Sequence, residues 1–171
     1  MDLSSSINNS FFAASGGNDY AIIIYSVKDT SLHPCWEIPN AHEGIVTSVL
    51  FGSGMGTGML YSGGMDCSVK VWSVLAKELV GELRYHSSKV VSLCQSSDGR
   101  YLVSASADRV VLMYDISKNF EVVYRLETKE EPACMTFHHT SLVIGMKAGG
   151  CQVWNIQLSF VCDKHKKWII A

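Results

Sequence analysis

The stretch Ser62-Gly-Gly-Met-Asp66-Cys-Ser-Val-Lys-Val-Trp72 contains a serine, an aspartate four residues later and a large aromatic residue six residues after that. The same spacing recurs as Ser15–Asp19–Tyr25 and as Ser104–Asp108–Tyr114. A fourth copy, at Ile144, Ala148 and Trp154, keeps only the aromatic residue. The four aromatic residues are 47, 42 and 40 residues apart. A period near 40 residues indicates a repeat protein, in which each unit is one small structural module.

Short strands and turns fill each unit. Apolar and polar residues alternate along Val69–Trp72, as expected for a half-buried strand, and Ser97–Arg100 has the composition of a tight turn. No helical pattern of useful length competes with this alternation. The period and the strands together predict an all-β fold of β-propeller blades, about four in number, each with four antiparallel strands. The predicted units span residues 1–28, 29–75, 76–117 and 118–157, and residues 158–171 hold a last outer strand and the start of a fifth unit.

The residues of two units resemble the WD-repeat β-propeller family. In that family a unit carries a histidine before its first strand, then a serine or threonine, an aspartate in a turn and a tryptophan. The matching sets are His42, Ser62, Asp66, Trp72 and His86, Ser104, Asp108, Tyr114. No unit contains a literal Trp-Asp pair, although Tyr114-Asp115 is close to one. The resemblance implies an incomplete propeller that binds other proteins or peptides.

The chemistry of these residue types predicts a structural hydrogen-bond relay in each complete unit. An aspartate in a tight turn accepts from backbone amides and from imidazole, the imidazole contacts the serine hydroxyl, and an indole N–H donates to that hydroxyl. The first unit contributes Ser15, Asp19 and Tyr25 to this set but lacks the histidine. The fourth unit lacks both serine and aspartate, so we expect it to be the loosest or to depend on packing around Trp154.

Composition and charge exclude several classes of protein. The chain has 171 residues, of which 47% are hydrophobic and 18% charged; its net charge is −2. This balance disfavours a nucleic-acid-binding domain, and the one basic cluster, Lys164–Lys167, is short. No stretch approaches a membrane span, and the N-terminus lacks the pattern of a signal peptide. Together with six cysteines that form no C-x-x-C pair, these features predict a cytoplasmic or nuclear protein without metal or cofactor.

Three patterns that could indicate chemistry have structural interpretations. Serine, histidine and aspartate are the residue types of a hydrolase triad, but a set that recurs in successive units is not an active site. The glycine-rich stretch Gly52–Gly58 lacks the phosphate-loop pattern and precedes a strand, so a mobile loop is expected. His138 and His139 are adjacent, so on a strand they would point to opposite faces and could not share a metal ion; a position at a strand end or in a turn is expected for them.

The function that the sequence favours is a non-catalytic scaffold or adaptor for protein–protein interaction. Repeat surfaces bind through loops held by a rigid frame. The candidate contact residues flank the relay turns and are Asn18, Tyr20, Met65, Ser88 and Arg109. Two alternatives stay open: a hydrolase that uses a cysteine or histidine, and a propeller that binds nucleic acid or lipid.

The extent of the chain leaves three alternatives. Four units are fewer than the roughly seven that are usual in the family, so the chain is expected to be part of a larger propeller. It could instead self-associate through open blade edges. The third alternative is a closed ring of four blades, in which residues 168–171 and Met1–Leu3 share one innermost strand position.

Overall fold

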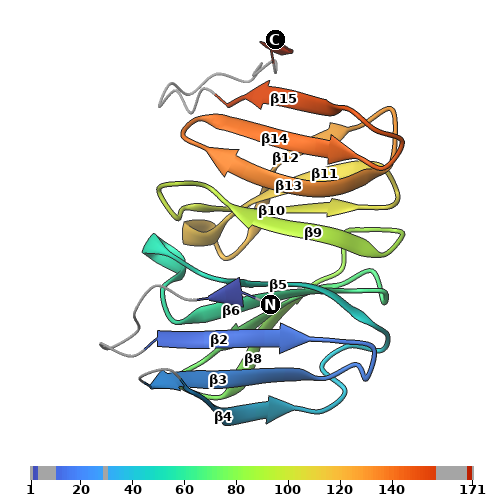
Figure 1. Cartoon of the computed structure of the whole chain (residues 1–171). Helices are drawn as coiled ribbons and strands as arrows, with labels where there is room; N and C mark the ends of the chain where they lie inside the picture. The colour runs from blue at the N-terminus through green and yellow to red at the C-terminus, as the bar shows by residue number, and fades with distance from the viewer. Residues whose placement is uncertain (1, 4–10, 29–30, 157–168, 171) are drawn as a thin grey trace.

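The computed structural model describes residues 2–3, 11–28, 31–156 and 169–170, and it consists of four antiparallel four-stranded sheets (Figure 1). The first sheet contains β1 (Asp2–Leu3), β2 (Phe11–Gly16), β3 (Ile22–Lys28) and β4 (Ser31–Ile38). The second contains β5 (Val46–Phe51), β6 (Met59–Gly64), β7 (Val69–Ser73) and β8 (Glu78–Leu83). The third contains β9 (Val90–Gln95), β10 (Tyr101–Ser106), β11 (Val110–Asp115) and β12 (Glu121–Glu127). The fourth contains β13 (Pro132–His138), β14 (Ser141–Met146), β15 (Cys151–Asn155) and β16 (Ile169–Ile170).

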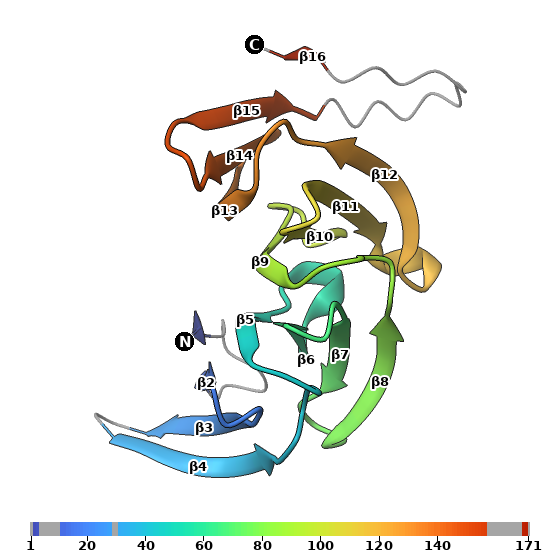
Figure 2. The same cartoon turned by 90° about the vertical axis from the view of Figure 1, so that its right-hand side faces the viewer.

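The sheets follow one another along an arc, with their first strands on the inner side and their last strands outside (Figure 2). Every sheet keeps the chain order of its strands, and each strand pairs antiparallel with its neighbour. Two short 3-10 turns, Gly54–Gly56 and Ile116–Lys118, are the only helical elements among the described residues. The prediction of an all-β fold made of four-stranded propeller blades is therefore confirmed.

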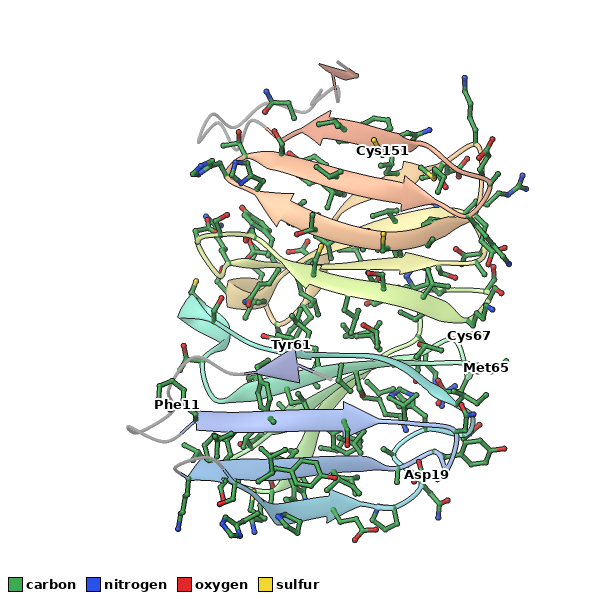
Figure 3. All side chains as sticks on the ribbon, in the orientation of Figure 1. Phe11, Asp19, Tyr61, Met65, Cys67 and Cys151 are labelled. Atoms are coloured by element: carbon green, nitrogen blue, oxygen red, sulfur yellow. The ribbon has the colours of Figure 1, made fainter. Side chains whose placement is uncertain are left out.

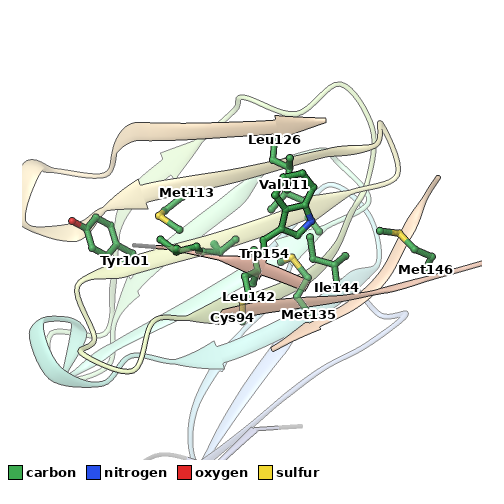
Figure 4. Packing of buried hydrophobic residues seen from close by; sticks show 13 residues of the cluster. Cys94, Tyr101, Val111, Met113, Leu126, Met135, Leu142, Ile144, Met146 and Trp154 are labelled. Carbon is green, nitrogen blue, oxygen red and sulfur yellow. The ribbon is translucent and has the colours of Figure 1, made fainter. Parts of the chain in front are cut away.

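The hydrophobic core lies between successive sheets, in three separate clusters. Ile22 and Ile24 of the first sheet pack with Leu60 of the second. A second cluster joins the second and third sheets around the buried Tyr61 and Tyr114. The third cluster places Trp154 and its neighbours against the third sheet (Figure 4). Each inner sheet therefore buries apolar side chains on both faces, which explains why its strands are more uniformly apolar than strands with one solvated face.

Close approach of neighbouring sheets requires glycine at two equivalent positions. A Cβ atom added to Gly63 in β6 would lie 2.6 Å from Cγ1 of Val90, the first residue of the next sheet. Gly16 in β2 has the same relation to Val46, the first residue of β5, and a Cβ there would overlap the valine methyl group. A valine at the start of each following sheet thus fills the space that the glycine leaves.

Polar side chains also connect the sheets. Thr47 Oγ1 lies 2.9 Å from the carbonyl oxygen of Gly63 and 2.5 Å from that of Val90, so it contacts both the second and the third sheet. The glycine-rich stretch Gly52–Gly58 was expected to be a mobile loop. It lies at the end of the strands away from Thr47 and is held there by Gln95. Gln95 Oε1 accepts from the Ser53 N–H at 2.8 Å, and Gln95 Nε2 donates to the Ser53 carbonyl at 3.1 Å.

The two terminal strands belong to different sheets. β1 pairs with β2 in the first sheet, whereas β16 pairs with β15 in the fourth, at the other end of the arc. The two segments therefore do not share one strand position, and the four-sheet ring considered above is not formed. The rest of the predicted fifth-unit segment, residues 158–168, and with it the basic cluster Lys164–Lys167, lies outside the described residues.

We predict that Gly63→Ala lowers the free energy of unfolding by about 1–3 kcal/mol, because the added methyl group overpacks the contact with Val90. The matched control is Gly81→Ala in β8, where an added Cβ meets no atom within 4 Å. Urea denaturation of both variants measures the difference. Equal midpoints for the two variants would contradict the close-approach explanation.

Candidate functional site: buried relays beneath a loop face

His42, Ser62, Asp66 and Trp72 form a continuous hydrogen-bonded chain across the second sheet. Nδ1 of His42 lies 3.0 Å from both carboxylate oxygens of Asp66, and its Nε2 lies 2.7 Å from Ser62 Oγ. The indole N–H of Trp72 donates to the same hydroxyl at 2.8 Å. This chain of hydrogen bonds joins the loop before β5 to the middle of β6, to the β6–β7 turn and to β7.

The donors and acceptors of the relay fit one arrangement of protons. Burial lowers the pKa of His42 from its usual value, although the hydrogen bond from His42 to Asp66 and the charge of Asp66 oppose this shift, so the imidazole is neutral. Nδ1–H of the neutral ring donates to the Asp66 carboxylate, which leaves Nε2 as an acceptor of the Ser62 hydroxyl proton. The indole N–H can only donate, so Ser62 Oγ accepts from it.

Backbone amides hold the Asp66 carboxylate as well. Its oxygens accept from the Glu43 N–H at 3.0 Å and from Ser68, whose N–H and hydroxyl lie at 3.1 and 2.8 Å. Burial by itself disfavours the ionised carboxylate, but the hydrogen bonds from Glu43, His42 and Ser68 outweigh this cost and lower the pKa of Asp66 to about 2. The carboxylate is therefore ionised throughout the neutral range, which keeps both sides of the turn tied together.

The third sheet repeats the arrangement with tyrosine in place of tryptophan. His86 Nε2 lies 2.7 Å from Ser104 Oγ, and Nδ1 lies 3.2 Å from Asp108. The Tyr114 hydroxyl is 3.1 Å from Ser104 Oγ and fills the place of the indole N–H. Since Ser104 donates to the imidazole, the tyrosine hydroxyl is the donor in this last contact. Asp108 also accepts from the Ser87 N–H at 2.8 Å.

The first and fourth sheets do not form this chain of hydrogen bonds. In the described part of the first sheet, no hydrogen bond connects Ser15, Asp19 and Tyr25; the Asp19 carboxylate accepts from the Ala21 N–H at 3.3 Å. In the fourth sheet, Ile144 occupies the serine position and packs with Trp154 in the apolar cluster. Hydrophobic packing thus takes the place of the polar relay where the serine and aspartate are missing.

The five candidate contact residues all lie at the end of the strands that carries the relay turns. Asn18, Tyr20, Met65 and Arg109 are exposed, while Ser88 is half-buried. Asp19, Met65 and Cys67 mark this end of the sheets in Figure 3. The residue after each turn aspartate has a left-handed backbone, with φ values of 66° at Tyr20, 66° at Cys67 and 65° at Arg109. Sequence reasoning missed Cys67, and the alignment of the three aspartates would have identified it.

The remaining sequence signals have structural explanations. The expected position of the two histidines at a strand end or in a turn is confirmed: His138 ends β13, and His139 follows it with φ of 52°, so the two rings lie 4.3 Å apart. Across the described ranges, no group of three potential metal-ligating side chains comes together. In the same part of the chain, no helix is long and apolar enough to cross a membrane.

The family description "WD domain, G-beta repeat" matches residues 34–73 and 77–115. These ranges contain both complete relays. This chain belongs to the WD-repeat family. Each matched WD repeat starts in the outer strand of one sheet, β4 or β8, and continues through the first three strands of the next. A WD repeat is therefore displaced by one strand from a sheet, so that two successive repeats build each sheet between them.

Curated WD-repeat relatives match most of this chain but are much longer. The U3 small nucleolar RNA-associated protein 15 homolog of Xenopus tropicalis is 40% identical over 126 residues, which is 72% of this chain and 22% of the relative. The DDB1- and CUL4-associated factor 11 homolog of Caenorhabditis elegans is 34% identical over 60% of this chain and 18% of its own length. Pre-mRNA-processing factor 19 of Mus musculus is 26% identical over 92% of this chain and 31% of its own length.

We predict that Asp66→Ala and Asp108→Ala each lower the free energy of unfolding by about 1–3 kcal/mol, because each leaves a buried histidine without its acceptor. Asp19→Ala is the matched control: it occupies the same repeat position but is exposed and contacts no histidine. Its effect should stay within about 0.5 kcal/mol. Thermal and urea unfolding measure all three, and equal losses at Asp19 and Asp108 would contradict a structural role of the relay.

We also predict that stability falls on acidification in two stages. His42 and His86 have pKa values lowered by burial, so below about pH 6.5 the unfolded chain binds protons that the folded chain does not. The stability present above that pH is lost as the pH falls. Asp66 and Asp108, whose folded pKa values are lowered, add a second loss below about pH 4.

Urea denaturation at pH values from 8 to 3 tests this profile. Each buried histidine contributes a slope of at most about 1.4 kcal/mol per pH unit. In His86→Gln the slope between pH 6.5 and 5 should be smaller than in the parent, because the buried histidine whose pKa is lowered is absent. A profile without slope in that interval would show that the two histidines are not held neutral by the fold.

Proposed function

We propose that this chain is a non-catalytic scaffold or adaptor that binds other proteins or peptides on the loop face above the relays. The observation that carries this proposal is the position of the relays: they are buried, while the turns that they hold are exposed. His42 is 1% and Ser62 0% exposed, so neither reaches a substrate. Their burial favours a structural use of the Ser–His–Asp residues over hydrolysis, as does their repetition in two sheets.

The left-handed turn residues support a binding role for this face. A non-glycine residue with φ near 65° is strained, and glycine would occupy the position at lower cost. The fourth sheet does have glycine at the equivalent position, Gly149, with φ of 102°. Tyr20 and Arg109 keep bulky side chains there instead. Both residue types often dominate binding energy at protein interfaces, and Tyr20 is 44% exposed.

The names of the relatives indicate the kind of assembly. One is described as associated with U3 small nucleolar RNA and another with DDB1 and CUL4. By this similarity we propose that the chain acts within a multi-protein complex, in the nucleus. The RNA in the first name favours a second candidate function, direct RNA binding, although the net charge of −2 opposes it.

The unit boundaries form part of the proposal. We propose that the units are residues 29–75 and 76–117, flanked by 1–28 and 118–157, because the two matched ranges lie inside the middle pair. On this division the left-handed turn residues of successive units present one side chain each to the same face.

We predict that the double variant Tyr20→Gly and Arg109→Gly loses its bound proteins without loss of stability, because glycine relieves the backbone strain. Quantitative affinity purification from nuclear extract compares it with the parent. The matched control is Lys77→Gly with His139→Gly; both residues are also left-handed, with φ of 56° and 52°, but lie at the opposite end of the strands. The control should keep the same partners.

Two outcomes would redirect the proposal. If the loop-face variant and the control retain the same proteins at the same level, the partner does not bind this loop face. The second outcome is that ribonuclease treatment removes the captured proteins from both the loop-face variant and the control. If the purified chain then also binds RNA with a steep salt dependence, direct RNA binding replaces the scaffold function.

A further inference from the structure

The turn between β10 and β11 is surrounded on the loop face by three cationic residues from three separate segments of the chain. The Ala107 N–H donates to the carbonyl oxygen of Lys89 at 3.0 Å, and the Thr128 N–H donates to that of Arg109 at 2.8 Å. Lys129 follows Thr128 directly. Backbone hydrogen bonds therefore fix Lys89, Arg109 and Lys129 around one turn, and we call these three residues the basic corner.

The position of Lys89 recurs in two other sheets, where the residue is not a cation. The Met65 N–H donates to the carbonyl oxygen of Ile45 at 2.9 Å in the second sheet, and the Lys147 N–H donates to that of Glu131 at 2.9 Å in the fourth. These hydrogen bonds are equivalent to the one that Lys89 accepts. The third sheet thus has a lysine where its neighbours have an isoleucine and a glutamate.

The position of Arg109 differs between the sheets in the same way. The equivalent left-handed or positive-φ residues are Tyr20, Cys67 and Gly149, none of which is charged. The second, third and fourth sheets have both positions within the described part of the chain, and the third alone carries a cation at each. The charge therefore belongs to this one turn and is not a general property of the repeat.

The cations of the basic corner form no ion pair with a carboxylate in the described part of the chain. The other three described arginines do, and the distances are 2.9 Å for Arg84–Glu82, 3.0 Å for Arg100–Asp115 and 3.4 Å for Arg125–Glu127. Lys147 and Glu131 of the adjoining turn are likewise paired, at 3.0 Å. The basic corner consequently keeps charge that its surroundings have neutralised.

Two carboxylates neighbour the basic corner along the chain, Asp108 and Glu130. The Asp108 carboxylate is engaged by His86 at 3.2 Å and by the Ser87 N–H at 2.8 Å, so its charge is directed into the relay. Glu130 is exposed and forms no ion pair with a described cation. Even with both carboxylates counted, the three cations are in excess.

The basic corner is accessible and lies beside an exposed aromatic ring. Arg109 and Lys129 are exposed, and Lys89 is half-buried. The loop that carries Lys89 also contains Tyr85, which is 55% exposed and whose ring centroid lies 6.0 Å from that of Tyr114. Tyrosine and arginine are residue types that often dominate binding energy at protein interfaces. The region therefore combines unpaired charge with an aromatic contact.

We propose that the basic corner binds an acidic segment, rich in aspartate and glutamate, of a partner protein. This inference rests on the proposed function, because it names the chemistry of the partner that the loop face would bind. Cations that are held on a fixed turn and have no internal partner attract carboxylates without first breaking an ion pair of the chain. Complementary charge of this kind supplies specificity and a fast association rate.

The small extent of the basic corner favours a peptide over a nucleic acid. A protein that makes roughly 6–10 phosphate contacts needs a long row of cations. The positive charge does not continue to the adjoining turns, which have Ile45 and Glu131 at the position of Lys89. A short acidic segment needs only the cations of one turn, and the net charge of −2 opposes a longer polyanion.

Fluorescence anisotropy on the full 171-residue chain tests the proposal. The probe is a short labelled peptide of consecutive glutamates, and the same peptide with glutamines in their place is its control. We expect the glutamate peptide to bind, and its affinity to fall as the salt concentration rises from about 50 to about 200 mM, because screening weakens exposed ion pairs. The glutamine peptide should not bind.

Paired variants locate the binding on the molecule. Lys89→Gln with Lys129→Gln should lower the affinity for the glutamate peptide at least about fivefold, since two exposed ion pairs are lost. The matched control is Lys28→Gln with Lys118→Gln, which removes the same charge from two exposed lysines at the opposite end of the strands. Its affinity should stay within about twofold of the parent. Circular dichroism verifies that both variants are folded.

Three results would overturn the proposal. The first is a parent chain that does not bind the glutamate peptide, and the second is an equal affinity of the corner variant and its control. The third is a single-stranded RNA of the same charge that binds the parent more tightly than the peptide and loses affinity in the corner variant, which would assign the basic corner to nucleic acid.

Failure of this inference and failure of the proposed function give different results. If the corner variant binds the glutamate peptide as the parent does, while Tyr20→Gly with Arg109→Gly loses its captured proteins, the loop face binds proteins through other contacts and only this inference fails. If the glutamate peptide binds at the basic corner but the loop-face variant keeps every captured protein, this inference stands and the proposed location of the partner fails.

Discussion

The structure depends on the packing of each small sheet against the next one in the stack. A four-stranded sheet with apolar side chains on both faces is not stable alone, because its hydrophobic surface needs a neighbour on each side. The three core clusters lie between sheets and not within them. Glycine at positions 16 and 63 lets a valine of the next sheet approach the backbone, which sets how closely the sheets pack.

The relays fix the connections between successive sheets. A repeat begins in the outer strand of one sheet and ends in the third strand of the next, so the loop between them must be fixed. Asp66 and Asp108 fix it by accepting hydrogen bonds from a histidine and from backbone amides in that loop. Because every polar group is satisfied, burial of the relay is tolerated in a low-dielectric interior. Rigid turns then present exposed side chains in a constant arrangement, which is what a binding surface requires.

Much of the fold was predictable because the same residue types recur at the same spacing in successive units. The spacing of serine, aspartate and aromatic residues identified the number of sheets, and the alternation of polar and apolar residues located the strands. Prediction was weaker where backbone conformation decides the outcome. The position of His138 and His139 at a strand end was expected, but the 4.3 Å separation of their rings follows from the left-handed backbone of His139, with φ of 52°. The loop at Gly52–Gly58 has no sequence signal for order, yet Gln95, which lies 42 residues after Ser53, holds it in place.

By itself the sequence determined the class of the fold, the phase of the repeats and the residues available for hydrogen bonding, because these follow from local spacing. Only the tertiary structure decided which of them meet. Ser62 and His42 lie 20 residues apart in the chain and 2.7 Å apart in space, whereas the equally spaced Ser15, Asp19 and Tyr25 form no chain of hydrogen bonds. The physical reason is that a hydrogen bond needs both partners at contact distance, and that distance is set by how one sheet packs on the next.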